Sequence, residues 1–143
     1  MGEARTVMDR LTEAMTTSDP DGKAIADLYA EDAVAITPDV GEVRGRDAIV
    51  EYLRTMTDSV PEATYTSLNK YEIGDTAIDE GIFSGRNTGP ILLPTGETLP
   101  PTGKEVSIRG VDIATVRDGR IESYRLYYDQ LQFLDQLGLL PEA

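Results

Sequence analysis

Two versatile catalytic side chains are missing from this chain of 143 residues, which contains neither cysteine nor histidine. The lack of cysteine excludes disulfides, thiolate metal sites and cysteine nucleophiles. The lack of histidine excludes serine–histidine and cysteine–histidine arrangements and the usual imidazole metal ligands. Carboxylates, tyrosines, lysines and arginines are therefore the groups that could move protons in any reaction of this protein.

Positive charge is also scarce, with 13 Lys and Arg against 26 Asp and Glu and a formal net charge of -13. Such a chain would repel nucleic-acid phosphates and anionic lipid surfaces, so we expect neither nucleic acid nor membrane as a partner. The N-terminus lacks an apolar signal stretch, and no run approaches about 20 apolar residues. We therefore expect a cytoplasmic protein, with residues 1–143 forming one domain.

Helical patterns dominate the first sixty residues. Apolar residues at helical spacing predict a helix over residues 4–15. Asp19 as a cap and Pro20 as the first helical residue predict a second helix, whose buried face would be Ile25, Leu28 and Tyr29. Residues 33–37 have the pattern of a short strand, and a third helix is predicted over residues 46–57.

Strand patterns dominate the second half. Residues 64–73 and 76–88 predict a hairpin with bulges or strong bending. Residues 89–103 hold four prolines and three glycines, which predicts a loop without structure of its own, serving as a flap or a partner contact. A short helix is predicted over residues 130–137. This order predicts an α+β fold in which helices cover one face of a curved antiparallel sheet.

The last hairpin is the clearest element, with strands over residues 106–117 and 120–129 around Asp118-Gly119, a dipeptide preferred in two-residue turns. If the hairpin has no bulge, Asp112 lies opposite Arg125. One face then carries the polar residues Asp112, Arg125, Tyr127 and Asp129. The opposite face carries mostly apolar residues and one charge: Val111, Ile113, Tyr124, Leu126, Tyr128 and Arg109. The polar face either lines a ligand site or faces solvent with an ordinary cross-strand ion pair.

The two acids of this hairpin would act independently. Asp112 and Asp129 would lie roughly 13 Å apart along the sheet, too far to share a proton as paired catalytic carboxylates do. A carboxylic acid in an apolar pocket has a raised pKa, which would suit either residue to general acid or base chemistry.

Several short stretches, taken in order, resemble those of the SnoaL-like polyketide cyclase or ester cyclase family, within the nuclear transport factor 2-like superfamily. They are LYAEDA (28–33), GRDAI (45–49), PTGK (101–104), RGVD (109–112), DGRI (118–121), YYDQ (127–130) and QLG (136–138). The resemblance covers nearly the whole chain. It implies a cone-shaped fold, with a bent sheet wrapped by about three N-terminal helices around a pocket, commonly in a homodimer packed through the sheets.

The resemblance also implies chemistry. SnoaL-type cyclases close a ring by an intramolecular aldol reaction in which an aspartate on the last strand is acid and base without any cofactor, and Asp129 is the matching residue. Asp112 falls where ketosteroid isomerases carry an oxyanion-donating aspartic acid. Limonene epoxide hydrolase-like members need an aspartate–arginine–aspartate cluster, whose residue types Asp112, Arg125 and Asp129 supply. Other members of the superfamily only bind ligands.

The sequence thus favours an enzyme without cofactor or metal, of cyclase, isomerase or lyase type, that acts on a small, apolar, oxygenated molecule. Asp129 and Asp112 are the expected catalytic residues. The expected substrate-binding residues are Arg125, Tyr127, Arg109, Tyr52 and Tyr29. Buried tyrosines at helical spacing, such as Tyr29 and Tyr52, are usually core residues, and a strand arginine such as Arg109 more often pairs with a carboxylate or stays solvated. A ligand-binding domain without catalysis is the alternative, and a protein-binding surface is a third possibility.

Overall fold

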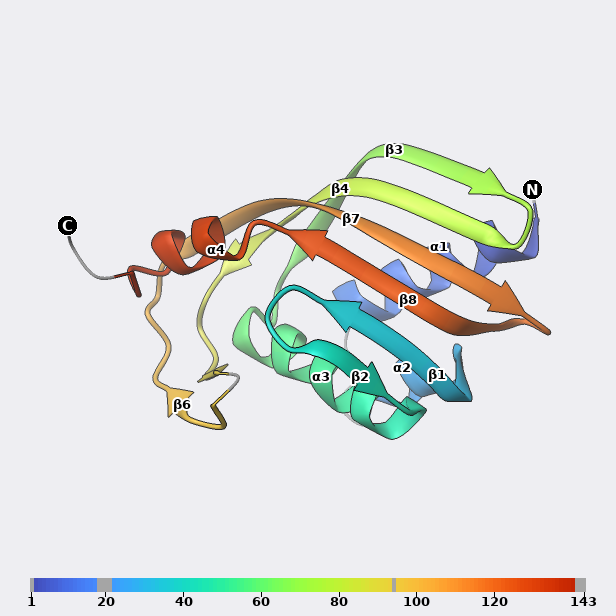
Figure 1. Ribbon diagram of the computed structural model, residues 1–143. Coiled ribbons are helices and arrows are strands. Elements are labelled where there is room, and N and C mark those ends of the chain that lie inside the picture. Colours follow the sequence, from blue (N-terminus) through green and yellow to red (C-terminus); the bar gives the residue numbers. More distant parts are fainter. Residues whose placement is uncertain (1, 18–21, 94, 141–143) are drawn as a thin grey trace.

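The computed structural model describes residues 2–17, 22–93 and 95–140. Its main sheet has six strands in the order β2-β1-β8-β7-β4-β3, and only the β1–β8 pair is parallel. The strands are β1 Tyr29–Thr37, β2 Gly41–Arg44, β3 Thr64–Ile73, β4 Thr76–Arg86, β7 Glu105–Arg117 and β8 Arg120–Tyr128. Figure 1 shows this sheet with helices lying along one of its faces.

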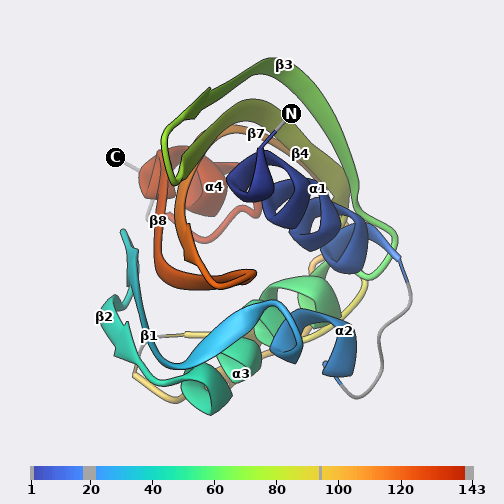
Figure 2. The same ribbon diagram turned by 90° about the vertical axis from the view of Figure 1, so that its right-hand side faces the viewer.

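The helices are α1 Glu3–Thr16, α2 Lys23–Ala26, α3 Arg46–Ser59 and α4 Gln130–Gln136. Seen from the side, the sheet arches over α1, with α2 and α3 beneath it (Figure 2). This curved sheet around a helical interior confirms the predicted α+β cone. No helix of the described residues combines the length and hydropathy needed to cross a membrane.

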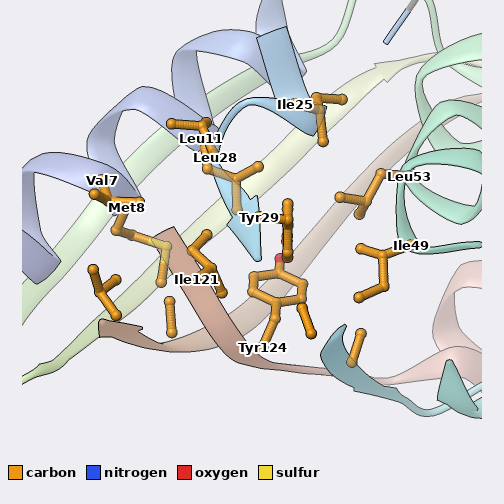
Figure 3. Close-up of a cluster of buried hydrophobic side chains, with 14 of the residues drawn as sticks. Val7, Met8, Leu11, Ile25, Leu28, Tyr29, Ile49, Leu53, Ile121 and Tyr124 are labelled. Carbon is orange, nitrogen blue, oxygen red and sulfur yellow. The ribbon is translucent and has the colours of Figure 1, made fainter. Parts of the chain in front are cut away.

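The apolar stripe of α1 packs against the inner face of the sheet. Val7, Met8 and Leu11 are almost fully buried and meet core residues from α3 and the sheet (Figure 3). Burial of each such side chain stabilises the fold by about 1.5–3 kcal/mol, so the helical spacing seen in the sequence has a direct energetic reason. The predicted first and third helices are both confirmed, the first longer by one residue at each end and the third by two residues at its C-terminal end.

The region between α1 and α3 differs from the prediction. The second helix has only four residues, because the chain is already extended at Tyr29, which pairs with Ile121 of β8. The parallel pairing of β1 with β8 therefore outweighs the helical pattern. Gly41–Arg44, between the predicted strand and the third helix, forms β2 against β1. The proposed capping residues Asp19 and Pro20 lie outside the described residues.

The proline-rich segment 89–103 has more structure than predicted. It contains a small hairpin, β5 Ile91–Leu92 with β6 Thr98–Leu99. The fully buried Asn87 anchors both ends of the segment. Its amide nitrogen donates to the carbonyl oxygens of Ser59 and Gly89, and its side-chain oxygen accepts from the backbone N–H and hydroxyl of Thr102, all at 2.7–3.1 Å.

Replacing Asn87 with alanine would leave several buried backbone groups without partners, each costing about 1–3 kcal/mol. We therefore expect Asn87→Ala to lower the free energy of unfolding by about 2–4 kcal/mol in urea denaturation. The exposed Asn69, whose side-chain amide donates to Glu80, provides the control, and Asn69→Ala should change stability by less than about 1 kcal/mol. Equal effects of the two substitutions would contradict the anchoring role.

Candidate functional site

A cavity lies between the inner face of the sheet and the helices. Its volume is about 140 Å³, and α1, α3, β5, α4 and the sheet all contribute to its wall. Most of the lining is apolar, with residues such as Leu11, Leu53 and Phe83. The ionisable lining residues are few: Asp39, Tyr65, Asp112, Tyr124 and Tyr128. An apolar cavity with a few polar groups is typical of small-molecule sites.

Two paired glycines in the middle of the sheet line the cavity. Gly81 of β4 pairs directly with Gly110 of β7, and both line the cavity. A Cβ atom at Gly81 would lie 2.2 Å from the Cζ atom of Tyr65, so the glycine makes room for that phenol ring. This explains glycine in the interior of a strand, where it otherwise weakens packing.

Asp112 is one of the two aspartates among the described residues that line the cavity. The hydroxyl of Tyr124 donates to its Oδ2 atom at 2.6 Å. Burial raises the pKa of Asp112 to about 6, the Tyr124 hydrogen bond opposes this rise, and the nearby Asp79 charge adds to it. A carboxyl with a pKa near neutrality exchanges protons readily in both directions, which general acid–base catalysis requires.

A bulge at Glu122 decides which residues of β8 face this acid. Val116 pairs with Ile121, but Thr115 then pairs with Ser123, which leaves Glu122 unpaired in the strand register. Every later pair is shifted by one residue. The predicted pairing of Asp112 with Arg125 is therefore wrong, because Asp112 pairs with Leu126.

The shift brings a different set of β8 residues into the cavity. Tyr124, Leu126 and Tyr128 line it together with Asp112, although the unbulged register placed them on the opposite face. The three polar residues expected beside Asp112 do not share its face. Arg125 and Tyr127 are exposed on the outer face of the sheet, as is Arg109 of β7.

Asp129 lies at the start of α4 and not in the cavity wall. It is exposed, and its Oδ1 atom accepts a hydrogen bond from the backbone N–H of Gln132 at 3.0 Å. This is the position and bonding of a helix N-cap. The sequence contained that signal, because an aspartate directly precedes a short helical pattern. A structural role accounts for all the contacts that the structure gives Asp129.

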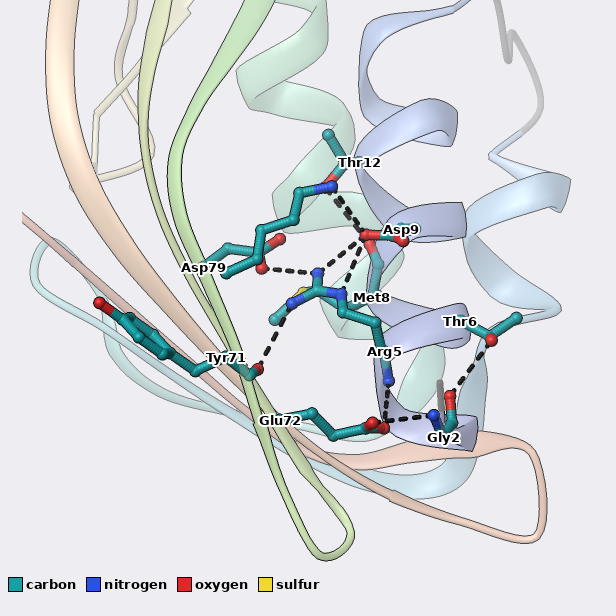
Figure 4. A network of polar contacts seen from close by, with 10 residues as sticks. Gly2, Arg5, Thr6, Met8, Asp9, Thr12, Tyr71, Glu72 and Asp79 are labelled. Atoms are coloured by element: carbon teal, nitrogen blue, oxygen red, sulfur yellow. Dashed lines mark hydrogen bonds and ion pairs between the residues drawn. The ribbon is translucent and has the colours of Figure 1, made fainter.

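A second aspartate, which the sequence did not single out, sits directly across from Asp112. Asp79 of β4 pairs with Asp112 of β7, and only 1% of its surface is exposed. Its charge is compensated by Arg5 of α1, whose Nη2 atom lies 2.5 Å from Asp79 Oδ1 and also contacts Asp9 (Figure 4). Burial raises the pKa of Asp79, and the Arg5 guanidinium opposes the rise.

Two tyrosine hydroxyls near Asp112 are buried without a hydrogen-bond partner among the described residues, those of Tyr29 and Tyr65. Burial raises the pKa of both phenols, and the Asp112 charge adds to the rise. Tyr65 is among the residues that line the cavity. Tyr29 is fully buried, and its ring packs edge to face with Tyr124 at 6.1 Å (Figure 3).

Comparison with known proteins supports this description of the fold. The model of the SnoaL-like domain family matches residues 8–124. The chain belongs to this family. None of the curated proteins compared with the chain matches it.

Solved structures share the fold across almost the entire chain. A protein assigned as a SnoaL-like polyketide cyclase from Jannaschia sp. CCS1 has a TM-score of 0.83 at 19% identity, covering 97% of this chain and 94% of its own. IdmH from Streptomyces antibioticus, assigned as a polyketide cyclase, has a TM-score of 0.74 at 24% identity, covering 96% and 99%. An LEH-like epoxide hydrolase from M. tuberculosis has a TM-score of 0.69 at 18% identity, covering 94% and 89%.

Because the pKa of Asp112 is raised in the folded state, the stability of the protein should depend on pH. The folded state favours the protonated carboxyl of Asp112. The free energy of unfolding is therefore highest below the unfolded pKa near 4, and it falls as the pH rises through the folded pKa of about 6. We expect the parent to lose about 2 kcal/mol relative to Asp112→Asn between pH 4 and pH 8. Urea denaturation at both pH values measures this, with the exposed Asp58→Asn as a baseline. A constant difference between parent and Asp112→Asn would refute the shift.

Proposed function

We propose that this protein catalyses a cofactor-free reaction at a carbonyl group of a small, apolar, oxygenated molecule, with Asp112 as general acid and base. The observation that carries this proposal is the Asp112 carboxyl itself, which is held by Tyr124 in an apolar cavity with its pKa near 6. Membership of the SnoaL-like family and the fold shared with assigned polyketide cyclases make an aldol-type ring closure the leading reaction.

The proposed steps conserve atoms and charge. The Asp112 carboxylate removes a proton from the carbon next to a ketone, and the C–H electron pair moves to form an enolate. The free Tyr65 hydroxyl donates to the enolate oxygen, which stabilises the developing charge. The enolate carbon then attacks a second carbonyl of the same molecule. The resulting alkoxide takes the proton back from Asp112, which restores the carboxylate.

Turnover by aspartate variants tests the assignment. On a panel of aromatic β-keto esters, enones and epoxides, Asp112→Asn should lower kcat by at least about 100-fold, because an amide cannot carry the proton. Asp129→Asn should retain most activity and lose only some stability, since its carboxylate caps α4. Tyr124→Phe should move the acidic limb of the pH–rate profile to higher pH, because its hydrogen bond lowers the pKa of Asp112. Loss of turnover in Asp129→Asn alone would overturn the assignment to Asp112.

Epoxide hydrolysis is a second candidate, supported by the pairing of Asp79 with Asp112 and the contact of Arg5 with Asp79. These three residues form an aspartate–arginine–aspartate group from elements other than those expected from the sequence. One acid could activate water while the other protonates the epoxide oxygen. Turnover confined to epoxides, and lost in Asp79→Asn as well as in Asp112→Asn, would favour this reaction. Binding of the panel with no turnover would favour a non-catalytic domain.

We also propose that a second copy of the chain covers the outer face of the sheet. This face carries aliphatic and aromatic side chains, including Tyr71 and Tyr127, which are 54% and 45% exposed. Rows of paired residues place Ile78 beside Ile113 and Glu80 beside Val111. Arginines and a glutamate stand among the apolar groups, so two copies related by a two-fold axis could match opposite charges.

A lysine in the middle of this face should prevent such pairing, because two buried charges would meet across the two-fold axis. We expect the parent to sediment as a dimer in analytical ultracentrifugation and Ile113→Lys to sediment as a monomer with an unchanged circular dichroism spectrum. Leu131→Lys, at an apolar residue 65% exposed on α4, is the matched control and should remain dimeric. A monomeric parent would refute the proposal.

A further inference from the structure

A second carboxyl, separate from Asp112, also faces the cavity. Asp39 lies in the turn between β1 and β2 and lines the cavity wall. Tyr52 of α3 donates to its Oδ1 atom at 2.8 Å, while no described residue bonds its Oδ2 atom. Tyr128 lines the cavity beside it. Burial raises the pKa of Tyr52 and of Tyr128, and the Asp39 charge adds to both rises, which agrees with their proximity.

The order of the strands gives the spacing of the two acids. Asp39 follows β1 in the turn to β2, and Asp112 lies on β7 opposite Leu126 of β8. Because β8 lies between β1 and β7, at least about two strand spacings, roughly 10 Å, separate the backbones of the two acids across the sheet. Both residues line the same cavity, so a ligand about as long as two fused six-membered rings would lie between them.

The charged residues of the cavity wall, among the described residues, are all acidic. Asp39 and Asp112 are acidic, and no Lys or Arg occurs among the described residues that line the cavity. A bound carboxylate or phosphate would meet two acids and no counter-charge, which is costly in an apolar site. A hydroxyl or ammonium group would instead find the open Asp39 oxygen, and a hydrogen bond to a carboxylate is about twice as strong as a neutral one.

From this geometry we infer that Asp39 is a specificity-determining site that accepts a hydrogen bond from a hydroxyl or protonated amine at the far end of the ligand. Tyr52 anchors the carboxylate, and Tyr128 forms the adjoining wall. The cavity then selects two-ring ketones that carry such a donor and rejects those that carry an acid. Only the position of the carbonyl at Asp112 rests on the proposed function, since the Asp39 contact concerns binding alone.

Isothermal titration with four two-ring ketones tests the inference in Asp112→Asn protein, which removes turnover. The probes are 2-tetralones with a hydroxyl, methoxy, aminomethyl or carboxyl group at carbon 6. The hydroxyl and aminomethyl compounds should bind at least about 10-fold more tightly than the methoxy compound, which matches the hydroxyl compound in shape but lacks the donor. The carboxyl compound should bind most weakly. The two donor compounds distinguish a neutral from a cationic ligand.

Variants separate recognition of the ligand from simple support of the turn. Asp39→Asn, added to Asp112→Asn, should reduce the hydroxyl-to-methoxy affinity ratio to about 1–3, because the acceptor charge is lost. Tyr52→Phe breaks the same internal hydrogen bond but leaves the carboxylate, so it should lower thermal stability similarly while keeping most of the ratio. The exposed Asp32→Asn, on β1 before the same turn, is the matched control and should change neither quantity.

Three results would overturn the inference: an unchanged ratio in Asp39→Asn, binding of the carboxyl compound as tight as that of the hydroxyl compound, or no binding of any of the four ketones. Failure of this inference can be told apart from failure of the proposed function. A donor preference that depends on Asp39, in a parent protein that turns over none of the panel, would leave the specificity site standing and remove the catalytic role of Asp112.

Discussion

The bulge at Glu122 is the constraint on which the cavity depends. Because side chains alternate along a strand, one unpaired residue moves the whole remainder of β8 to the other face. The bulge places Tyr124, Leu126 and Tyr128 inside and leaves Arg125 and Tyr127 outside. Without it, an arginine would enter the apolar interior, and the tyrosine that holds Asp112 would point to solvent.

The interior acids follow from the same sheet. Pairing of β4 with β7 sets Asp79 directly beside Asp112, and two neighbouring carboxylates in an apolar site cannot both ionise cheaply. Arg5, which α1 brings from the other layer, compensates Asp79 and leaves Asp112 without a cationic partner among the described residues. The two acids therefore have different environments, one ion-paired and one held by a tyrosine beside the cavity.

Much of the fold was predictable because it depends on local patterns. The spacing of Val7, Met8 and Leu11 predicted α1, and Asp118-Gly119 predicted the turn of the last hairpin, where both residues have positive φ. The helical pattern around Tyr29 was misleading, because pairing with β8 is a contact between segments about ninety residues apart. Likewise, the tertiary role of Asn87 gives the proline-rich segment an order that its composition does not suggest.

For the site, the sequence by itself determined which chemistry was available: no cysteine or histidine, an acidic chain, and a last hairpin containing Asp112. It also carried the family likeness, which the match over residues 8–124 establishes. Only the tertiary structure decided which side chains meet. A single bulge set the inner face of β8, and strand pairing brought Asp79 to Asp112. Packing of a turn on α3 placed Asp39 in the cavity wall, because these contacts join residues whose separation along the chain leaves no local pattern.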